Sequence, residues 1–483
     1  MTVADLVPLL PLLILGVAPV VIMLVLAFHR DHQVTLALTL LALTASFFSL
    51  PIASAEAPRR VTELLIVDRY ALFYMGLLIA ASCAVVLLSY SYLEQRAGQH
   101  EEFYLLILLA TLGSATLVAS RHFAAFFLGL EVLSVSLYAL MAYPRTWAHG
   151  IEAGIKYLIL AAGSAAFLLF GIALVYAELG SLEFGTIARL QVAGHGANPL
   201  VLLTGVGLLV VGIGFKLAVV PFHQWTPDVY EGAPAPVAGF VATSSKGAMF
   251  ALLLRLFGQM DLAARGPVFQ VFLAIAIASM LIGNLLALLQ NNVKRILAYS
   301  SIAHLGYLLV ALLAGGVFAV VAATFYLVAY FITTLTVFGI LTLLSTGERD
   351  ADRLEDYRGL FWRHPWLAAA FSASLLSLAG IPLTVGFVGK FYLVAAGVGH
   401  ALWPALFVLV ATSVIGLFYY LRIIVAMSLQ PAEKSKAPTL APSMSLSGSL
   451  VLAVLVLLLV CLGVYPSPFI HMIQEAASLV QGA

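Results

Sequence analysis

The chain has 483 residues, of which 63% are hydrophobic and only 9% are charged, with a net charge of +1 at pH 7. Because a soluble domain carries about 25% charged residues, this composition excludes a water-soluble globular protein and indicates a polytopic membrane protein. The near-zero net charge gives no indication of nucleic-acid binding. Two cysteines, Cys83 and Cys461, are too few for a Cys-ligated iron–sulfur cluster within the chain, and we do not expect a disulfide.

Apolar stretches long enough to cross a bilayer recur along the whole chain, since a helix needs about 20 residues to do so. The predicted fold is therefore all-α, with about 14 transmembrane helices. The predicted spans are 6–28, 33–52, 70–91, 103–120, 123–142, 154–178, 198–220, 235–257, 268–290, 294–314, 317–345, 367–397, 402–428 and 447–465. The first residues lack the basic start of a cleavable signal, so we expect the first span to be retained.

Three connections between these spans stand out. Residues 59–69 are rich in β-branched and apolar side chains, which predicts a small hairpin outside the membrane. The loop 347–364 is the most charged, and residues 430–443 are polar and Pro-rich, as in a flexible connection. Lysine and arginine are more frequent after odd-numbered spans than after even-numbered ones, which predicts that both termini face away from the cytoplasm.

The seventh span contains a charge and then a break. Lys216 lies inside the apolar run 200–220, and Pro221 directly after the run cannot continue the helical hydrogen bonds. Irregular backbone at membrane depth is tolerated only where protein or a water-filled cavity covers it. A buried ammonium beside a broken helix is typical of an ion pathway.

A second break resembles the first. Lys390 follows the sequence Gly-Ile-Pro-Leu-Thr-Val-Gly at 380–386, in the twelfth span, as Lys216 precedes Pro221 in the seventh. The surroundings of Tyr157 in the sixth span resemble those of Tyr326 in the eleventh, and both offsets are about 170 residues. Chance similarity between apolar helices is the competing explanation.

Spans 4–8 and 9–13 are therefore predicted to be two repeats with discontinuous helices 7 and 12. The repeats must be inverted, because they are five helices apart and five is odd. Inverted repeats with paired broken helices predict a transport site near the midplane of the membrane. We expect an N-terminal segment at 1–100, the two repeats at 101–260 and 261–430, and a linker with the last span at 431–483.

Four ionisable residues lie deep inside apolar spans: Glu131, Lys216, Lys246 and Lys390. A charge at mid-bilayer costs about 3 kcal/mol or more, so each needs a partner or water. One carboxylate cannot neutralise three lysines, which argues against static ion pairs, although structural salt bridges and snorkelling remain the alternative. Lysine, unlike arginine, can release its proton when buried. A carboxylate near Lys216 would hold its proton, and moving the carboxylate away would release it, so we predict a proton path.

Weaker candidates flank this path. His304 could relay a proton between Lys246 and Lys390, with a structural histidine as the alternative. Lys156 lies four residues after Glu152, which predicts an interfacial ion pair, or else a place on the input path. We expect structural or anchoring roles for His223, Asp228, Lys294 and Arg295. Phosphate-binding glycine loops, metal-ligand spacings and nucleophile–base pairs are not recognisable in the sequence.

The chain resembles the antiporter-like subunits of bacterial respiratory complex I, the proton-pumping NADH:quinone oxidoreductase, over nearly its full length. The most specific match is the sequence His-Gln-Trp-Thr-Pro-Asp-Val-Tyr-Glu-Gly-Ala-Pro at 223–234. Related subunits L and M share a His-x-Trp-x-Pro-Asp core, and the Val-Tyr-x-Gly-Ala-Pro continuation favours subunit N. Ser245-Lys246, 380–382 and Gly389-Lys390-Phe391 also fit.

The resemblance implies roles for the buried charges. It makes Glu131 and Lys216 the pair of the first half-channel, Lys246 the central lysine and Lys390 the residue of the second half-channel. It also implies that FMN, iron–sulfur clusters and quinone lie in partner subunits, with no cofactor in this chain. The expected partners are the other membrane-arm subunits, in a hetero-oligomer, and membrane lipids of the bacterial cytoplasmic (inner) membrane, with no nucleic acid.

The implied function is proton translocation by a membrane-arm subunit, driven by redox chemistry in other subunits. Moving one charge against 100 mV requires about 2.3 kcal/mol, so such a drive is needed. A subunit of a multi-subunit cation/proton antiporter is the alternative, because that family shares the fourteen-helix module. A scaffold subunit with vestigial lysines is a third explanation.

Overall fold

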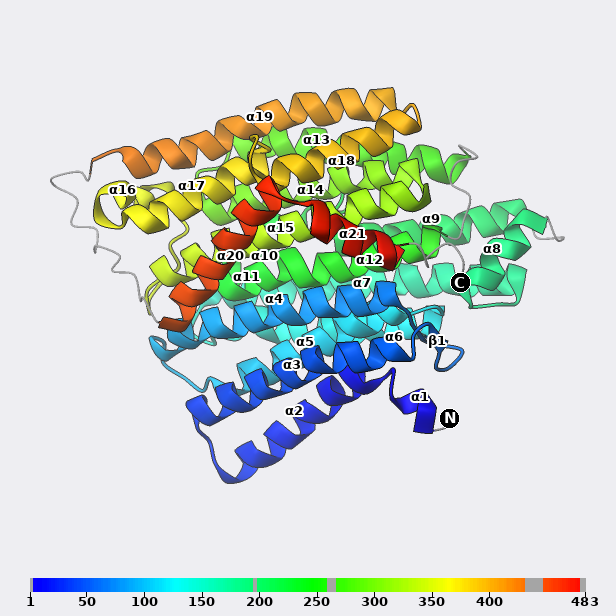
Figure 1. Cartoon of the computed structure of the whole chain (residues 1–483), viewed down its shortest axis with the longest axis horizontal. Coiled ribbons are helices and arrows are strands. Elements are labelled where there is room, and N and C mark those ends of the chain that lie inside the picture. Colours follow the sequence, from blue (N-terminus) through cyan, green and yellow to red (C-terminus); the bar gives the residue numbers. More distant parts are fainter. Residues whose placement is uncertain (1–2, 194–197, 259–265, 431–445, 478–483) are drawn as a thin grey trace.

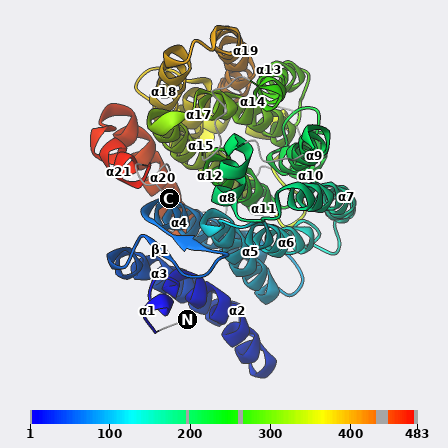
Figure 2. The ribbon, with the colours of Figure 1, turned by 90° about the vertical axis from the view of Figure 1, so that its right-hand side faces the viewer.

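The computed structural model describes residues 3–193, 198–258, 266–430 and 446–477. Its helices run roughly side by side in one bundle, which Figure 1 shows from the side and Figure 2 nearly along the helices. Within the described residues, 13 helices are long and apolar enough to cross a membrane, and two shorter apolar helices lie at 365–379 and 385–399. Together these two make the predicted twelfth crossing, so the all-α polytopic fold with about 14 spans is confirmed.

The N-terminal part begins at one end of the bundle and contains the predicted hairpin. Its elements are α1 (Val3–Leu6), α2 (Leu10–Phe28), α3 (His32–Ala55), β1 (Arg59–Arg60), β2 (Ile66–Val67) and α4 (Arg69–Glu94). The two strands pair antiparallel, Arg59 with Val67 and Arg60 with Ile66, as the composition of 59–69 predicted. Helices α2 and α3 lie at the edge of the bundle, whereas α4 also contacts α15 (Gly316–Leu344) of the second half (Figure 2).

The first repeat contains the first broken helix. Its elements are α5 (Glu101–Ala119), α6 (Phe123–Met141), α7 (Ala148–Leu179), α8 (Phe184–Ala193), α9 (Pro199–Leu217), α10 (Trp225–Gly232), α11 (Ala235–Phe240), the π-helix η1 (Val241–Ser245) and α12 (Lys246–Gly258). Helix α9 ends at Ala218, which has a left-handed φ of 60°, and the chain becomes helical again only in α10. The predicted break in the seventh span is confirmed, but α10, in a stretch rich in helix breakers, was not predicted.

The second repeat and the C-terminal helices follow. Their elements are α13 (Pro267–Leu288), α14 (Val293–Ala314), α15 (Gly316–Leu344), η3 (Leu354–Tyr357), α16 (Leu360–Arg363), α17 (Pro365–Ala379), α18 (Val385–Gly399), α19 (Trp403–Ser428), α20 (Leu446–Val464) and α21 (Ser467–Ala477). The second break lies between α17 and α18, where Gly380 has a φ of 86° and Thr384 caps α18. Beyond Gln430, the predicted flexible connection at 430–443 lies outside the described residues.

Two backbone hydrogen bonds reveal the internal repeat. In each repeat they join the residues before the second helix to the residues after the third. In the first repeat the bonds are Phe123 N to Leu182 O (2.9 Å) and Phe184 N to Arg121 O (3.0 Å). In the second, 170 positions later, they are Val293 N to Asp352 O (2.6 Å) and Leu354 N to Asn291 O (3.3 Å). We call each set a clamp.

The two clamps lie at opposite ends of the bundle. Helix α8, which follows the first clamp, is at the right-hand end of Figure 1, and α16, which follows the second, is at the left-hand end. Packing repeats as well: a Cβ on Gly113 would lie 2.6 Å from Leu133 N, and one on Gly283 would lie 2.8 Å from Ala303 N, again 170 positions later. Small residues that let helix backbones approach are typical of membrane bundles. The inverted repeat predicted for spans 4–8 and 9–13 is therefore confirmed.

Candidate proton path

Lys216 occupies the last turn of α9, just before the first break, and its side chain is buried. Its Nζ donates hydrogen bonds to Ser134 Oγ (2.7 Å) and to Tyr157 OH (2.8 Å). These hydroxyls come from α6 and α7 of the same repeat. A hydroxyl oxygen accepts from an ammonium, and the hydroxyl hydrogen can also donate to a neutral amine. The site can therefore hold Lys216 in either protonation state.

Glu131 lies on α6, one turn before Ser134, and is only partly buried. It interacts electrostatically with Lys216, but among the described residues no ion pair joins the two side chains. Leu128 and Val135, one turn to either side on α6, are 59% and 58% exposed. Glu131 therefore lies beside a face that this chain leaves uncovered and interacts with Lys216 electrostatically, whereas the hydrogen-bond partners of Lys216 are the two hydroxyls.

Lys246 begins α12, directly after the π-helix Val241–Ser245. Short π-helical segments of this kind occur frequently at functional sites. Its Nζ donates to Ser301 Oγ (2.7 Å) and lies 5.2 Å from the ring centroid of Tyr230 and 5.9 Å from that of Trp225. Aromatic faces attract a cation without accepting its proton. Lys246 is thus a buried amine with one hydroxyl partner and an aromatic wall.

Lys390 lies on α18, just after the second break, and is also buried. Its Nζ donates to the carbonyl of Ala379 (2.9 Å), the last residue of α17, and lies 5.1 Å from the ring centroid of Tyr307. The last carbonyls of a helix lack intrahelical partners and carry the negative end of its dipole, so they favour a cation.

One face of α14 connects the last two lysines. Ser301, His304 and Tyr307 follow each other at three-residue spacing, which places them on one side of the helix. Ser301 contacts Lys246 and Tyr307 contacts Lys390, with His304 between them. The His304 ring bonds to two tyrosine hydroxyls, Nδ1 with Tyr326 (2.7 Å) and Nε2 with Tyr420 (3.3 Å). His304 therefore lies between the contact points of Lys246 and Lys390 on α14, and both of these hydrogen bonds go to tyrosines rather than to a lysine.

Helix α10 connects the first two lysines. Its Trp225 ring lies 4.8 Å from the ring of Tyr157, a partner of Lys216, and Trp225 Nε1 donates to Phe215 O (2.9 Å). Tyr230, two turns along the chain from the break, has its hydroxyl 3.4 Å from Ser301 Oγ, the partner of Lys246. Hydroxyl and aromatic side chains therefore lie between the three buried lysines across both repeats. Between Tyr157 and Lys246 the contact is ring packing through Trp225, not a hydrogen bond.

Charged side chains of α7 and α14 pair with the two acidic residues of α10, Asp228 and Glu231. Lys156 Nζ pairs with Glu152 (2.7 Å), as predicted, and also with Asp228 on α10 (2.9 Å), which the sequence did not indicate. Arg295 Nη1 pairs with Asp228 (2.9 Å) and with Glu231 (2.8 Å). Two cavities of about 230 and 210 Å³ adjoin here and share His149, Glu231 and Gly232. These two cavities lie on the face of the bundle that is predicted to be cytoplasmic.

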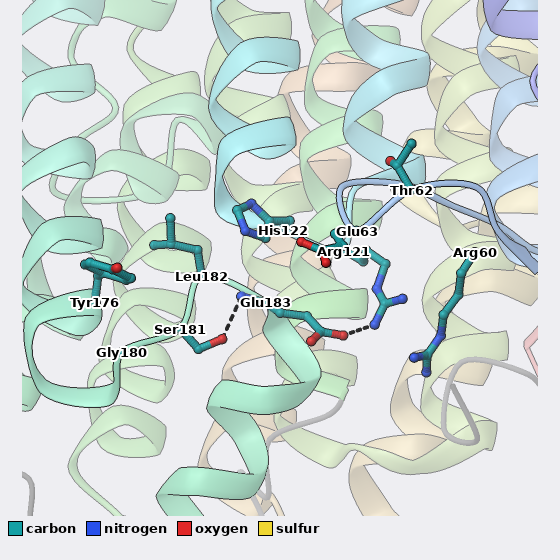
Figure 3. Close-up of a pocket in the computed structure, with 10 residues that line it drawn as sticks. All are labelled: Arg60, Thr62, Glu63, Arg121, His122, Tyr176, Gly180, Ser181, Leu182 and Glu183. Carbon is teal, nitrogen blue, oxygen red and sulfur yellow. Dashed lines mark hydrogen bonds and ion pairs between the residues drawn. The ribbon is translucent and has the colours of Figure 1, made fainter. Parts of the chain in front are cut away.

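A larger cavity of about 690 Å³ lies at the first clamp, at the other end of the bundle. Figure 3 shows Arg121 paired with Glu183, with His122 nearby and Arg60 on the hairpin side. The Nδ1 of His122 accepts a hydrogen bond from Ala124 N at the start of α6, and burial lowers the pKa of this imidazole. Desolvation and neighbouring arginines, Arg60 first, lower the pKa of Arg121.

Two buried groups of ion-paired residues were not predicted from the sequence. Arg255, in the last turn of α12, makes a bidentate pair with Asp68 at 2.7 and 2.8 Å, with only 1% and 0% of the two side chains exposed. The expectation that Lys294 anchors its span at the interface was wrong, because it is buried and pairs with Asp350 (2.6 Å), which also accepts from Arg96. In the described part of the chain, groups of three or more metal-ligating side chains are absent.

Comparison with known proteins identifies the family. A family model described as NADH:quinone oxidoreductase/Mrp antiporter, transmembrane, matches residues 120–416. NADH-quinone oxidoreductase subunit N of Ectopseudomonas mendocina is 48% identical, over 99% of this chain and 97% of that protein. NADH-quinone oxidoreductase subunit N of Nitrosospira multiformis is 52% identical, over 98% of this chain and 96% of that protein.

Solved structures agree with this placement. A chain of respiratory complex I from Thermus thermophilus is 34% identical and covers 95% of this chain and 98% of its own length, with a TM-score of 0.82. A chain of the Mrp complex from Dietzia sp. has a TM-score of 0.81 over 100% of this chain and 98% of its own, at 22% identity, which shows a shared fold. The chain therefore belongs to the NADH-quinone oxidoreductase subunit N family.

Proposed function

We propose that this chain is a proton-translocating membrane-arm subunit of bacterial NADH:quinone oxidoreductase. The observation that carries the proposal is the row of three buried lysines, Lys216, Lys246 and Lys390, each held by an oxygen partner inside apolar spans. The names of the relatives support it. The 22% identity to the Mrp chain supports only the common fold, so the antiporter alternative has no observation of its own.

In the proposed mechanism, protons pass between amines through hydroxyl and imidazole groups. Lys216 exchanges its proton with Ser134 and Tyr157, and Glu131, one turn away, stabilises the protonated amine while the two charges are close. Lys246 exchanges with Ser301, and His304 accepts a proton at one ring nitrogen and releases one at the other. Lys390 receives it and holds it against the end of α17. A lysine suits each step, since arginine keeps its proton.

The energy comes from outside this chain in the proposal. FMN, iron–sulfur clusters and quinone are bound by partner subunits, and this chain holds no redox centre. The partners are the other membrane-arm subunits of a hetero-oligomer, together with membrane lipids. The proposed division of the chain is an N-terminal segment at 1–100, two repeats at 101–260 and 261–430, and a linker with the last span at 431–483. Glu131 faces the uncovered side of α6, where a neighbouring subunit could change its environment.

The proposal is tested in the assembled complex with the single variants Glu131→Gln, Lys216→Ala, Lys246→Ala and Lys390→Ala. Each should lower proton pumping by about 10²-fold, the usual contribution of a positioned proton donor or acceptor. The coupled NADH oxidation should fall with it. The matched control is Arg358→Ala, an exposed charge of the loop 347–364, which should change neither. Normal pumping and normal NADH oxidation in the lysine variants would refute the proposal.

A further inference from the structure

We propose that Asp228 is a positioning residue that holds α10 between Lys216 and Lys246 by pairing at the same time with Lys156 of the first repeat and Arg295 of the second. The inference rests on the proposed proton path and adds a control point to it. When both ion pairs are formed, α10 connects the two lysines. When either pair opens, α10 shifts and the connection between the lysines is interrupted.

Helix α10 is separated from both neighbouring helices, α9 and α11, by non-helical residues. It has only eight residues, Trp225–Gly232, and six residues after Ala218 separate it from the end of α9. At its other end, Ala233 is extended and Pro234 precedes α11. Neither neighbouring helix therefore continues into it through backbone hydrogen bonds. Its position depends on packing and hydrogen bonds with other helices, chiefly α7 of the first repeat and α14 of the second.

Asp228 joins these two repeats through one carboxylate. Its Oδ2 lies 2.9 Å from Lys156 Nζ on α7, and its Oδ1 lies 2.9 Å from Arg295 Nη1 on α14. Each cation also has a second acidic partner, Glu152 for Lys156 and Glu231 for Arg295. Losing Asp228 therefore leaves neither cation unpaired. It removes the carboxylate that pairs with α7 and α14 at the same time, without leaving a buried charge uncompensated. Glu231 keeps its own contacts with Arg295 and Lys294 of α14, so the complex can still assemble.

Two aromatic residues of α10 contact the partners of the two lysines. Trp225, three residues before Asp228, packs on Tyr157, and Tyr230, two residues after it, lies beside Ser301 and Lys246. In so short a helix, these residues move together. A displacement of Asp228 toward either repeat therefore changes the surroundings of Lys216 and of Lys246 at once.

The ion pairs of Asp228 are placed where they can open. The side chains of Lys156 and Asp228 are 43% and 38% exposed, and they line the cavity of about 230 Å³. Partly exposed pairs contribute little to stability and exchange partners readily. The Arg255–Asp68 pair, which is almost fully buried, has no such freedom. Asp228 thus forms weak ion pairs that are exposed to water, and it lies on the same short helix as the residues that contact the partners of Lys216 and Lys246.

The test uses the complete complex with Asp228→Asn, Asp228→Glu, Lys156→Met and Arg295→Met, and measures protons pumped per NADH oxidised. Asp228→Asn should assemble in normal amount and lower this ratio by about fivefold, the low end of typical coupling between sites. Asp228→Glu keeps the charge and should restore most of the ratio. Lys156→Met and Arg295→Met should each lower it, and their combination with Asp228→Asn should add little.

Controls separate positioning from assembly and from the proton path itself. Glu102→Gln removes a comparably exposed ion pair, with Arg30, far from α10 and should leave the ratio unchanged. If Asp228→Asn does not assemble, Lys156→Met and Arg295→Met carry the same test. A normal ratio in all three variants, while Lys246→Ala abolishes pumping, would overturn this inference alone. Normal pumping in Lys246→Ala would overturn the proposed function.

Discussion

The two broken helices hold their lysines in different ways. Lys216 lies before the first break and is bound by side-chain hydroxyls of Ser134 and Tyr157. Lys390 lies after the second break and is bound by the backbone carbonyl of Ala379. The backbone clamps of the two repeats match at an offset of 170, so the architecture is repeated while the surroundings of the lysines are not.

The equivalent positions on α6 and α14 explain the difference. At the clamp offset of 170, Glu131 corresponds to Ser301 and Ser134 corresponds to His304. The first repeat therefore has a carboxylate and a hydroxyl at these positions, both near Lys216. The second has Ser301, which binds Lys246, and His304, which bonds to Tyr326 and Tyr420. Glu131 lies beside the face of α6 that this chain leaves uncovered, so contacts from outside the chain can alter the charge near Lys216. The second repeat has the groups expected for passing a proton onward.

The largest expected effect concerns the second break. A Cβ on Gly386 would lie 1.9 Å from Ser377 O, so Gly386→Ala must displace the start of α18 and with it Lys390. Overpacking costs about 1–3 kcal/mol, and a backbone collision at least the upper value. We expect little assembled complex in membranes. Gly207→Ala, on α9 of the first half and in open space, is the matched control and should assemble normally. Equal assembly of both variants would contradict the tight second break.

The next effect tests whether the lysines act through their protons. Lys216→Arg and Lys390→Arg keep the charge but cannot release it, so pumping should fall about 10²-fold in both. Lys156→Arg should retain most of its pumping, because Lys156 contributes an ion pair with Asp228 rather than a transferable proton. The measurement is proton pumping in membrane vesicles driven by NADH. Active arginine variants would instead indicate static charges.

Local sequence features predicted most of the fold. The lengths of the apolar stretches gave the spans, Pro221 and the 380–386 sequence marked the breaks, and the composition of 59–69 indicated the hairpin. Helix α10 was not recognised, because Trp-Thr-Pro-Asp reads as a helix-breaking stretch. Its proline lies in the first turn, where a missing N–H does no harm.

The site was predicted only where single residues carry the signal. A lysine or glutamate inside an apolar span is visible without knowledge of its neighbours, so Glu131, Lys216, Lys246 and Lys390 could be selected. Their partners could not, because the contacts join distant parts of the chain. Arg255 and Asp68 are 187 positions apart, and nothing near either residue indicates the other.

A smaller effect should distinguish the two lysine sites. Ser134→Ala and Tyr157→Phe each remove one hydroxyl partner of Lys216, and a hydrogen bond to a charged group is worth about 1.5–3 kcal/mol. Pumping should fall about tenfold or more in each. The carbonyl partner of Lys390 cannot be removed by a side-chain change. Tyr326→Phe, which removes a partner of His304, should have a weaker effect than either. An equal or larger loss in Tyr326→Phe would mean that the second repeat, too, depends on hydroxyl partners.

The smallest expected effect concerns the caps of α6 and α14, which occupy equivalent positions. His122 Nδ1 accepts from Ala124 N, and 170 positions later Asn292 Oδ1 accepts from Arg295 N. Only a neutral imidazole can accept, and burial lowers the pKa of His122, so its contribution is complete above the unfolded value of about 6.5 and is lost as the pH falls below it.

An N-cap is worth about 1 kcal/mol, so the wild-type complex should unfold at a slightly lower temperature at pH 5.5 than at pH 7.5. His122→Asn copies the cap of the second repeat and has no titratable group, so the part of this pH dependence that comes from α6 should disappear. Thermal unfolding of both proteins at the two pH values measures the difference. An identical pH dependence in the variant would mean that His122 keeps its cap when protonated, and that the two clamps differ more than their backbones do.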